Sequence, residues 1–270
     1  MALPLLQHKC YDAPSAFTPE SLLREARRQK GLVVAGVPAV CVLDPDGDLV
    51  RWLCDDGRAR IDPSWACYHT ELYQASVDGF EFGLVGCAVG APFAVLVAEE
   101  IFASGCQLLI SITSAGQLVE LRPPPYFVLI EKALRDEGTS YHYMPASEFS
   151  EADSTLLSLL DGGFDSIGIA VERGATWTTD APFRETDEAI ASMQKMGLLA
   201  VEMEAAALYA FACARGKAVV CFANVTNQMG RIDQDFEKGE ADGSVSSIVI
   251  IRTTAAILLP ALTTKGQVRG

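Results

Sequence analysis

Short apolar runs that end in turn residues recur along the chain and predict buried strands. The first is rich in valine and ends in Asp44-Pro45-Asp46-Gly47, and the next two run into small residues around Gly90 and Ser114. Turn residues directly after an apolar run are typical of a strand that leaves a buried sheet. On this pattern we predict strands over residues 37–43, 81–88, 107–113, 167–171 and 218–222.

Between these runs the polar and apolar positions change to a helical spacing. Thr18 precedes Pro19 and Glu20, which is the pattern of a helix N-terminus. We predict helices from there to about residue 30, and over residues 93–104, 187–196, 202–215 and 244–259. Apolar strands that alternate with helices favour an α/β fold, with a mixed, mainly parallel sheet flanked by helices. We expect a single domain over residues 1–270, in which residues 1–36 form an N-terminal helical extension.

Composition narrows the range of partners. The chain has 35 acidic and 21 basic residues and a net charge of -14, which disfavours binding to nucleic acid or to an anionic membrane surface. The uncharged run over residues 82–98 is interrupted by glycines and a proline, so strand, turn and helix explain it better than a membrane span. The eight scattered cysteines form no CxxC pair, and no secretory leader is visible. The sequence therefore predicts a cytoplasmic protein with reduced thiols.

Two carboxylates stand at the start of the most apolar helical segment. Glu202 and Glu204 flank Met203 and precede a run of alanines and other apolar residues, so they enter the protein interior. One interpretation is that they stabilise the helix N-terminus, worth roughly 0.3 to 1 kcal/mol. The other is that a carboxylate accepts hydrogen bonds from a diol, worth about 1.5 to 3 kcal/mol each.

Three further segments have residues suited to ligand binding. Gly90 and the Thr113-Ser114 pair follow strands, where small residues let main-chain NH groups approach an anion or a sugar, although a simple turn explains them as well. Trp177, Phe183 and Arg184 lie in one segment, and two aromatic rings with a cation suit a planar heterocycle, although a surface loop has the same composition.

Several enzyme classes are disfavoured by missing motifs. The three histidines have no metal-ligand spacing, and there is no His-Glu-x-x-His pattern or cysteine cluster, so we expect no metal site. Neither a nucleophile elbow of the Gly-x-Ser-x-Gly type nor a phosphate-binding Gly-x-x-x-x-Gly-Lys loop is present.

Taken together, these segments resemble the nucleoside phosphorylase family, which includes uridine phosphorylase, hexameric purine nucleoside phosphorylase and methylthioadenosine nucleosidase. The segment from Val201 to Ala207 is similar to the family's ribose-binding pattern, and the resemblance gives the ribose contacts to Glu202, Met203 and above all Glu204. Residues 87–116 are similar to the stretch that carries the family's phosphate and ribose sites, which implies a nucleophile site at Gly90, Thr113 and Ser114. The resemblance covers roughly residues 37–262.

The phosphate site departs from the family pattern. Family members carry an arginine at the end of a Gly-Asp-Pro-x-Arg turn, where this chain has Leu43-Asp44-Pro45-Asp46-Gly47. A second arginine is expected where Ser111 stands, and a third, lent by a neighbouring subunit, near Tyr68 or His69. All three are missing, and we expect Arg51, Arg58 or Arg60 to replace them only if the local backbone differs from that of the family.

The base site departs as well. Purine-specific relatives place an aspartate after the strand at residues 218–222, to protonate the leaving purine, and here Asn227 falls near that position. An amide cannot act as a general acid. The resemblance to uridine phosphorylase implies base contacts from Arg184 and Gln228, so the sequence favours a pyrimidine nucleoside, with Glu204, Arg184 and Asn227 as the residues closest to catalysis.

The sequence thus predicts a nucleoside phosphorylase that uses inorganic phosphate as co-substrate and needs no cofactor. Two alternatives remain open at this point: a hydrolytic nucleosidase on the same fold, and a nucleoside-binding protein without catalysis. The resemblance implies a homo-oligomer, a dimer or a hexamer, in which the segment from Trp65 to Tyr73 contributes to a neighbouring site.

Overall fold

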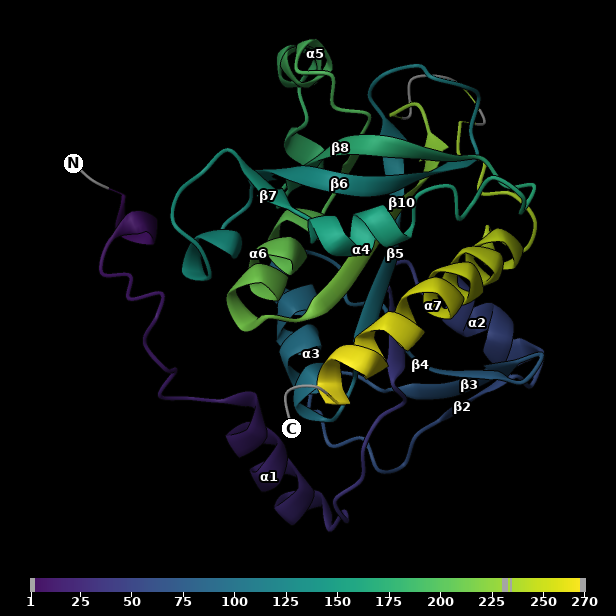
Figure 1. The fold of residues 1–270 in the computed structure, drawn as a ribbon. Coiled ribbons are helices and arrows are strands. Elements are labelled where there is room, and N and C mark those ends of the chain that lie inside the picture. Colours follow the sequence, from purple (N-terminus) through teal and green to yellow (C-terminus); the bar gives the residue numbers. More distant parts are fainter. Residues whose placement is uncertain (1–2, 230–232, 234, 268–270) are drawn as a thin grey trace.

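A mixed β-sheet organises the chain (Figure 1). The structure is a computed structural model that describes residues 3–229, 233 and 235–267. Within these residues ten strands form one sheet in the order β10-β6-β8-β9-β5-β1-β4-β3-β2, and β7 pairs with β6. The strands are β1 (Val40–Asp44), β2 (Ala59–Ile61), β3 (Tyr73–Val77), β4 (Phe80–Gly86), β5 (Leu108–Gln117), β6 (Tyr126–Asp136), β7 (Phe149–Glu151), β8 (Val171–Thr179), β9 (Ala200–Glu202) and β10 (Ala218–Asn227). Because β10 also pairs with β5, strands β5, β10, β6, β8 and β9 close into a ring.

Helices cover both faces of the sheet (Figure 1). They are α1 (Pro19–Lys30), α2 (Asp48–Asp55), α3 (Ala91–Ala103), α4 (Ser154–Leu159), α5 (Asp187–Lys195), α6 (Ala205–Arg215) and α7 (Ser244–Gln267), with short 3-10 helices η1 (Pro4–Leu6), η2 (Ser140–His142) and η3 (Pro182–Arg184). Helices α3 and α6 share one hydrophobic core with the sheet, and α2, α4 and α7 share the other. This arrangement confirms the predicted α/β fold.

The predicted elements agree with the structure where hydrophobic pattern and turn residues coincide. Strands β1, β4, β5 and β10 lie within a few residues of the predicted positions at their N-terminal ends, and β5 and β10 run further than predicted. Helix α1 begins after Thr18, whose side-chain oxygen accepts a hydrogen bond from the Ser21 N–H at 3.2 Å. The predicted N-cap is therefore confirmed.

Two predicted elements begin elsewhere in the structure. The elements that the sequence did not predict are the strands β2, β3, β6, β7 and β9 and the helices α2 and α4. The apolar residues 167–170 precede β8 instead of forming a strand, because Gly168 has a φ of +73° that breaks the extended backbone. The helix predicted from residue 202 begins at Ala205, since Glu202 ends β9 and pairs with Thr178 of β8. The second position was decided by sheet pairing, which is non-local.

Among the described residues, α7 is the one helix whose length and apolar composition would allow it to cross a membrane. Its side chains Ile248, Ile251 and Leu258 are at most 5% exposed and pack in the core with α2 and α4. One face of α7 therefore packs in the core of this domain.

The strand directions bring several loops to one edge of the sheet. Strands β1, β4, β5 and β10 run parallel, so their carboxyl ends meet at the same edge. Strand β9 pairs with the end of β5 at Gly116, and Asn227 of β10 pairs with Gly116 from the other side. In sheets of this kind ligands bind beyond the carboxyl ends of the strands, and the segments that the sequence singled out lie there.

Candidate active site at the carboxyl ends of the strands

Glu204 is a buried carboxylate with one oxygen unused. The residue lies between β9 and α6, and it is 1% exposed. Its Oε1 accepts a hydrogen bond from the Gly90 N–H at 2.7 Å, whereas Oε2 has no partner among the described residues. Burial, and next the charge of Glu202, raise the pKa of Glu204 to about 8, although the Gly90 N–H and the Thr113 hydroxyl oppose this shift. A buried acceptor that lacks a donor is suited to a ligand hydroxyl.

Glu202, in contrast, is fully engaged within the protein. Its Oε1 accepts hydrogen bonds from the hydroxyls of Thr176, at 3.2 Å, and Thr178, at 2.5 Å. Its Oε2 accepts the N–H groups of Glu204 and Ala205, both at 2.7 Å. Burial raises the pKa of Glu202, and these four donors oppose the shift. The structure thus gives Glu202 the role of holding the start of α6, and it leaves Glu204 as the carboxylate with a free acceptor; Met203 between them is half-buried.

Of the predicted nucleophile residues, Gly90 and Thr113 interact with Glu204, whereas Ser114 faces the other side of β5. Thr113 and Glu204 interact, and Gly90 donates to Glu204 from the N-terminus of α3. Gly90 adopts a φ of +89°, which favours glycine. The side chain of Ser114 points to the opposite face of the sheet from that of Thr113. Together with Ile112, two residues earlier on β5, it lines a cavity next to α2 and α7. The site therefore reaches around the end of β5.

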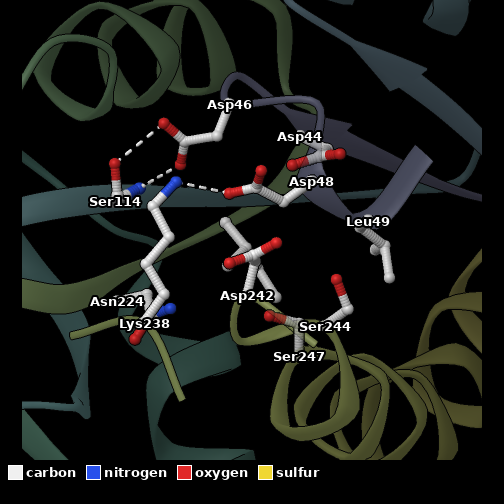
Figure 2. Close-up of a pocket in the computed structure, with 11 residues that line it drawn as sticks. Asp44, Asp46, Asp48, Leu49, Ser114, Asn224, Lys238, Asp242, Ser244 and Ser247 are labelled. Carbon is white, nitrogen blue, oxygen red and sulfur yellow. Dashed lines mark hydrogen bonds and ion pairs between the residues drawn. The ribbon is translucent and has the colours of Figure 1, made fainter. Parts of the chain in front are cut away.

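The donors of Ser114 are already occupied by an aspartate. Asp46, in the turn between β1 and α2, accepts a hydrogen bond from the Ser114 N–H at 2.8 Å and another from the Ser114 hydroxyl at 2.8 Å (Figure 2). A main-chain N–H and a hydroxyl that converge in this way are the groups that bind an oxyanion. Here a carboxylate of the chain itself takes the place of such an anion.

Lys238 is the cation of this cavity. Its ammonium group contacts Asp48 Oδ2 at 2.5 Å (Figure 2). Although burial opposes the shift, the hydrogen bond with Asp48 and the charges of Asp46 and Asp48 raise the pKa of Lys238. No sequence pattern singled out Lys238, because it lies in a loop without a recognisable motif, and Asp46 stood out only as a turn residue.

The three candidate arginines differ in position. Arg51 on α2 donates to the Asp46 carbonyl at 3.2 Å and pairs with Asp48, so it lies beside the cavity. Arg58 stacks on Trp52, with 4.1 Å between its guanidinium carbon and the ring centre, and Arg60 lies on β2 at the far edge of the sheet. Among these arginines, only Arg51 is near the predicted phosphate site.

Asp44 ends β1 below the same turn. Its carboxylate accepts the Val50 N–H at 2.9 Å and is 5% exposed. Burial, followed by the charges of Asp46 and Asp48, raises the pKa of Asp44 to about 7, and the Val50 N–H opposes this shift. With this pKa, the Asp44 carboxyl group is protonated in part of the molecules near neutral pH, which reduces the repulsion among the aspartates of the turn.

On the side expected to hold the base, Asn227 and Gln228 follow β10. The Asn227 side-chain oxygen accepts the Met229 N–H at 2.9 Å, and its amide nitrogen donates to the Thr226 hydroxyl at 3.1 Å. The Gln228 N–H donates to Asp235 at 2.7 Å. Asn227 lies across Gly116 from β9, so it is near the segment that carries Glu204.

The other three residues expected at the base have different environments. Trp177 is 3% exposed in a hydrophobic cluster and donates its indole N–H to Asp136 at 2.9 Å, so it is a core residue of β8. Phe183 is 99% exposed and Arg184 is exposed, both on η3. Because β8 and β9 run parallel, η3 and Glu204 leave the sheet at the same end. The structure thus separates Trp177 from the two residues of η3 that are free to contact a ligand.

No group of three or more metal-ligating side chains is found among the residues that the structure describes.

Comparison with known proteins agrees with this arrangement. The sequence profile of the Phosphorylase superfamily matches residues 39–259. The chain is 25% identical over 218 residues to the guanosine phosphorylase of Halorubrum lacusprofundi, which covers 78% of this chain and 89% of that protein. It is 28% identical over 159 residues to the DeoD-type purine nucleoside phosphorylase of Colwellia psychrerythraea, which covers 58% of this chain and 68% of that protein.

A solved structure of a nucleoside phosphorylase shares the fold of this chain. The crystal structure of uridine phosphorylase from Vibrio fischeri superimposes with a TM-score of 0.68 at 21% sequence identity, over 82% of this chain and 93% of that one. The resemblance to nucleoside phosphorylases that the sequence indicated is thereby confirmed. The carboxyl-end site, the profile match over most of the chain and the shared fold lead to one conclusion: this chain belongs to the phosphorylase superfamily.

Proposed function

We propose that this chain is a nucleoside phosphorylase that acts on a pyrimidine nucleoside. The bond between C1′ of the ribose and the base nitrogen breaks, and its electron pair leaves with the base, which takes a proton from solvent. A phosphate oxygen forms the new bond to C1′, so the products are the free base and ribose 1-phosphate. The observation that carries the proposal is Glu204, a buried carboxylate with one unused oxygen at the carboxyl ends of the strands.

Glu204 would hold the sugar. Its unused Oε2 accepts hydrogen bonds from ribose hydroxyls, and its negative charge stabilises the positive charge that develops on the ribose as the base departs. A bound diol supplies the donors that burial denies this carboxylate, so nucleoside binding favours its ionised form. Met203, next to it, packs against the sugar in this arrangement.

Arg184 and Gln228 would stabilise the departing base. A pyrimidine leaves as an anion whose charge spreads over its carbonyl oxygens, so it needs fixed hydrogen-bond donors and not a general acid. By its resemblance to the family, Asn227 falls near the position of the acid in purine-specific relatives, and its side chain is hydrogen-bonded to the Met229 N–H and the Thr226 hydroxyl. Since an amide cannot transfer a proton, this position supports a pyrimidine over a purine.

The substrate preference is tested with kcat/KM for uridine, inosine, guanosine and adenosine in the presence of phosphate. We expect uridine to be the best substrate, and we expect Asn227→Asp to raise the relative activity on inosine. An acid in that position contributes about 10² to 10⁴ in rate when it reaches the base. If guanosine or inosine is preferred by the unmodified protein, the pyrimidine assignment is wrong while the phosphorylase assignment stands; the names of the two curated relatives make this a real alternative.

A second candidate function is hydrolysis, with water in place of phosphate. It is favoured by the Asp46 carboxylate on the donors of Ser114 and by the missing arginines. The two functions differ in one measurement: base release that needs added phosphate supports phosphorolysis, and base release that is unchanged without phosphate supports hydrolysis.

A further inference from the structure

The cavity at Ser114 is lined by one lysine and four aspartates, and one of these aspartates occupies a pair of donors that could bind an anion. The Ser114 N–H and hydroxyl both donate to the Asp46 carboxylate at 2.8 Å, and the family resemblance of the sequence implies that Ser114 binds the nucleophile. A phosphate that binds to Ser114 needs these same two donors. It therefore competes with Asp46 for them.

The cation of the cavity is attached to the neighbouring aspartate. Lys238 pairs with Asp48 and reaches into the cavity from the loop that precedes α7, on the same side as Asp46 and Ser114 (Figure 2). In a chain that lacks the expected arginines, Lys238 is a positive charge that lines the cavity. An ammonium group is an effective phosphate ligand because it acts as a point charge with three donors.

Two buried polar groups in the cavity lack a partner. The Ser244 hydroxyl oxygen and the Asn224 side-chain oxygen make no hydrogen bond among the described residues, and the two residues are 1% and 6% exposed. Both residues line the same cavity as Ser114 and Lys238. Unpartnered polar atoms at such depth point to a ligand or water that the cavity is built to hold.

The size of the cavity shows why Asp46 has to move. The free volume is about 20 Å³, which is room for about one water molecule. This volume is too small for a phosphate beside the carboxylate, so a phosphate that uses the two donors of Ser114 has to replace Asp46.

We propose that Asp46 is an internal competitor of phosphate, and that Lys238 is the cation that binds phosphate when Asp46 leaves Ser114. This inference rests on the proposed phosphorylase function. Asp46 mimics the phosphate in the ligand-free protein, so it keeps Ser114 and its surroundings in the binding geometry and sets the phosphate concentration that the enzyme needs. Asp46 is thus a specificity-determining residue for the nucleophile and not a contact of the nucleoside.

The test is the KM for phosphate in Asp46→Ala and Asp46→Asn, measured with saturating uridine. We expect it to fall about tenfold in both variants, because phosphate no longer has to replace a charge-assisted hydrogen bond. Lys238→Met is expected to raise the KM for phosphate about tenfold. Lys238→Arg keeps the positive charge, so its KM for phosphate is expected to stay near that of the wild type. Asp161→Ala is the matched control, since this exposed carboxylate pairs only with Arg173 at a distance from the cavity, and it is expected to change nothing.

A second readout does not depend on turnover. Phosphate alone, without nucleoside, is expected to raise the Tm of Asp46→Ala more than that of the wild type, since a ligand that binds the folded state stabilises it by mass action. If no nucleoside is cleaved but this difference is found, the proposed function fails and the phosphate site stands.

Two results would overturn the inference. The first is a phosphate KM and a phosphate-induced Tm shift that stay unchanged in Asp46→Ala and Asp46→Asn, both of which fold. The second is base release in the wild type that is independent of phosphate and is lost in Asp46→Ala, because Asp46 would then be the base that activates water.

Discussion

Replacement of Glu204 by glutamine tests the centre of the proposed site. The amide keeps an oxygen that can accept the Gly90 N–H, which Glu204 Oε1 accepts at 2.7 Å, and it keeps the size of a side chain that is 1% exposed. What it removes is the negative charge and one acceptor oxygen, the oxygen that has no partner in the ligand-free protein. The variant therefore tests the charge and the free acceptor oxygen together, with the size of the side chain unchanged.

The expected loss follows from the strength of hydrogen bonds to a charged group. Such a bond contributes about 1.5 to 3 kcal/mol, so kcat/KM for the nucleoside is expected to fall roughly tenfold to more than a hundredfold. A ligand that binds mainly through the base would lose much less. The size of the loss thus reports on the sugar contact.

The same substitution is expected to change how the stability of the protein depends on pH. Because burial raises the pKa of Glu204 from 4.5 to about 8, the folded protein binds this proton more tightly than the unfolded chain. The resulting stabilisation is complete below the unfolded pKa and is lost as the pH rises toward 8, by at most about 1.4 kcal/mol per pH unit. Glutamine has no such proton, so the Tm of the variant is expected to rise relative to the wild type between about pH 4.5 and 8.

The assay combines steady-state kinetics with thermal unfolding, and Glu188→Gln, on the exposed surface of α5, is the matched control. Activity of Glu204→Gln within a factor of two of the wild type would show that Glu204 is only a charge at the end of a helix. Parallel Tm profiles of the two proteins across this pH range would refute the argument from burial.

Three further predictions concern the surroundings of the site. Glu202→Gln is expected to lower the free energy of unfolding by about 1 to 3 kcal/mol, because an amide group then faces buried N–H donors; an unchanged urea midpoint would contradict the structural role. Asp44→Asn is expected to flatten the loss of stability as the pH rises from about 4 to 7, because burial raises the pKa of Asp44 to about 7; a Tm profile parallel to that of the wild type would disprove this. Light scattering is expected to show a dimer or a hexamer, and a stable monomer would rule out a contribution of Tyr68 or His69 to a neighbouring site.

The sequence by itself determined the fold class and the place of the site. Apolar runs that end in glycine, serine and aspartate indicated β1, β4, β5 and β10, because burial and turn chemistry are local properties that a pattern records. The same pattern singled out Gly90, Thr113 and Ser114, and parallel strands bring such loops to one edge. Glu204 was singled out by the apolar helix that follows it.

The tertiary structure decided which of these residues are free to act. Glu202 and Glu204 are equivalent in the sequence pattern, but the hydroxyls that engage Glu202 come from Thr176 and Thr178, which are 26 and 24 residues away along the chain. Likewise, only the fold sets Asp46 on Ser114 across 68 residues and brings Lys238 to Asp48 across 190 residues. Contacts over such separations depend on strand register and helix packing, and no local sequence pattern records them.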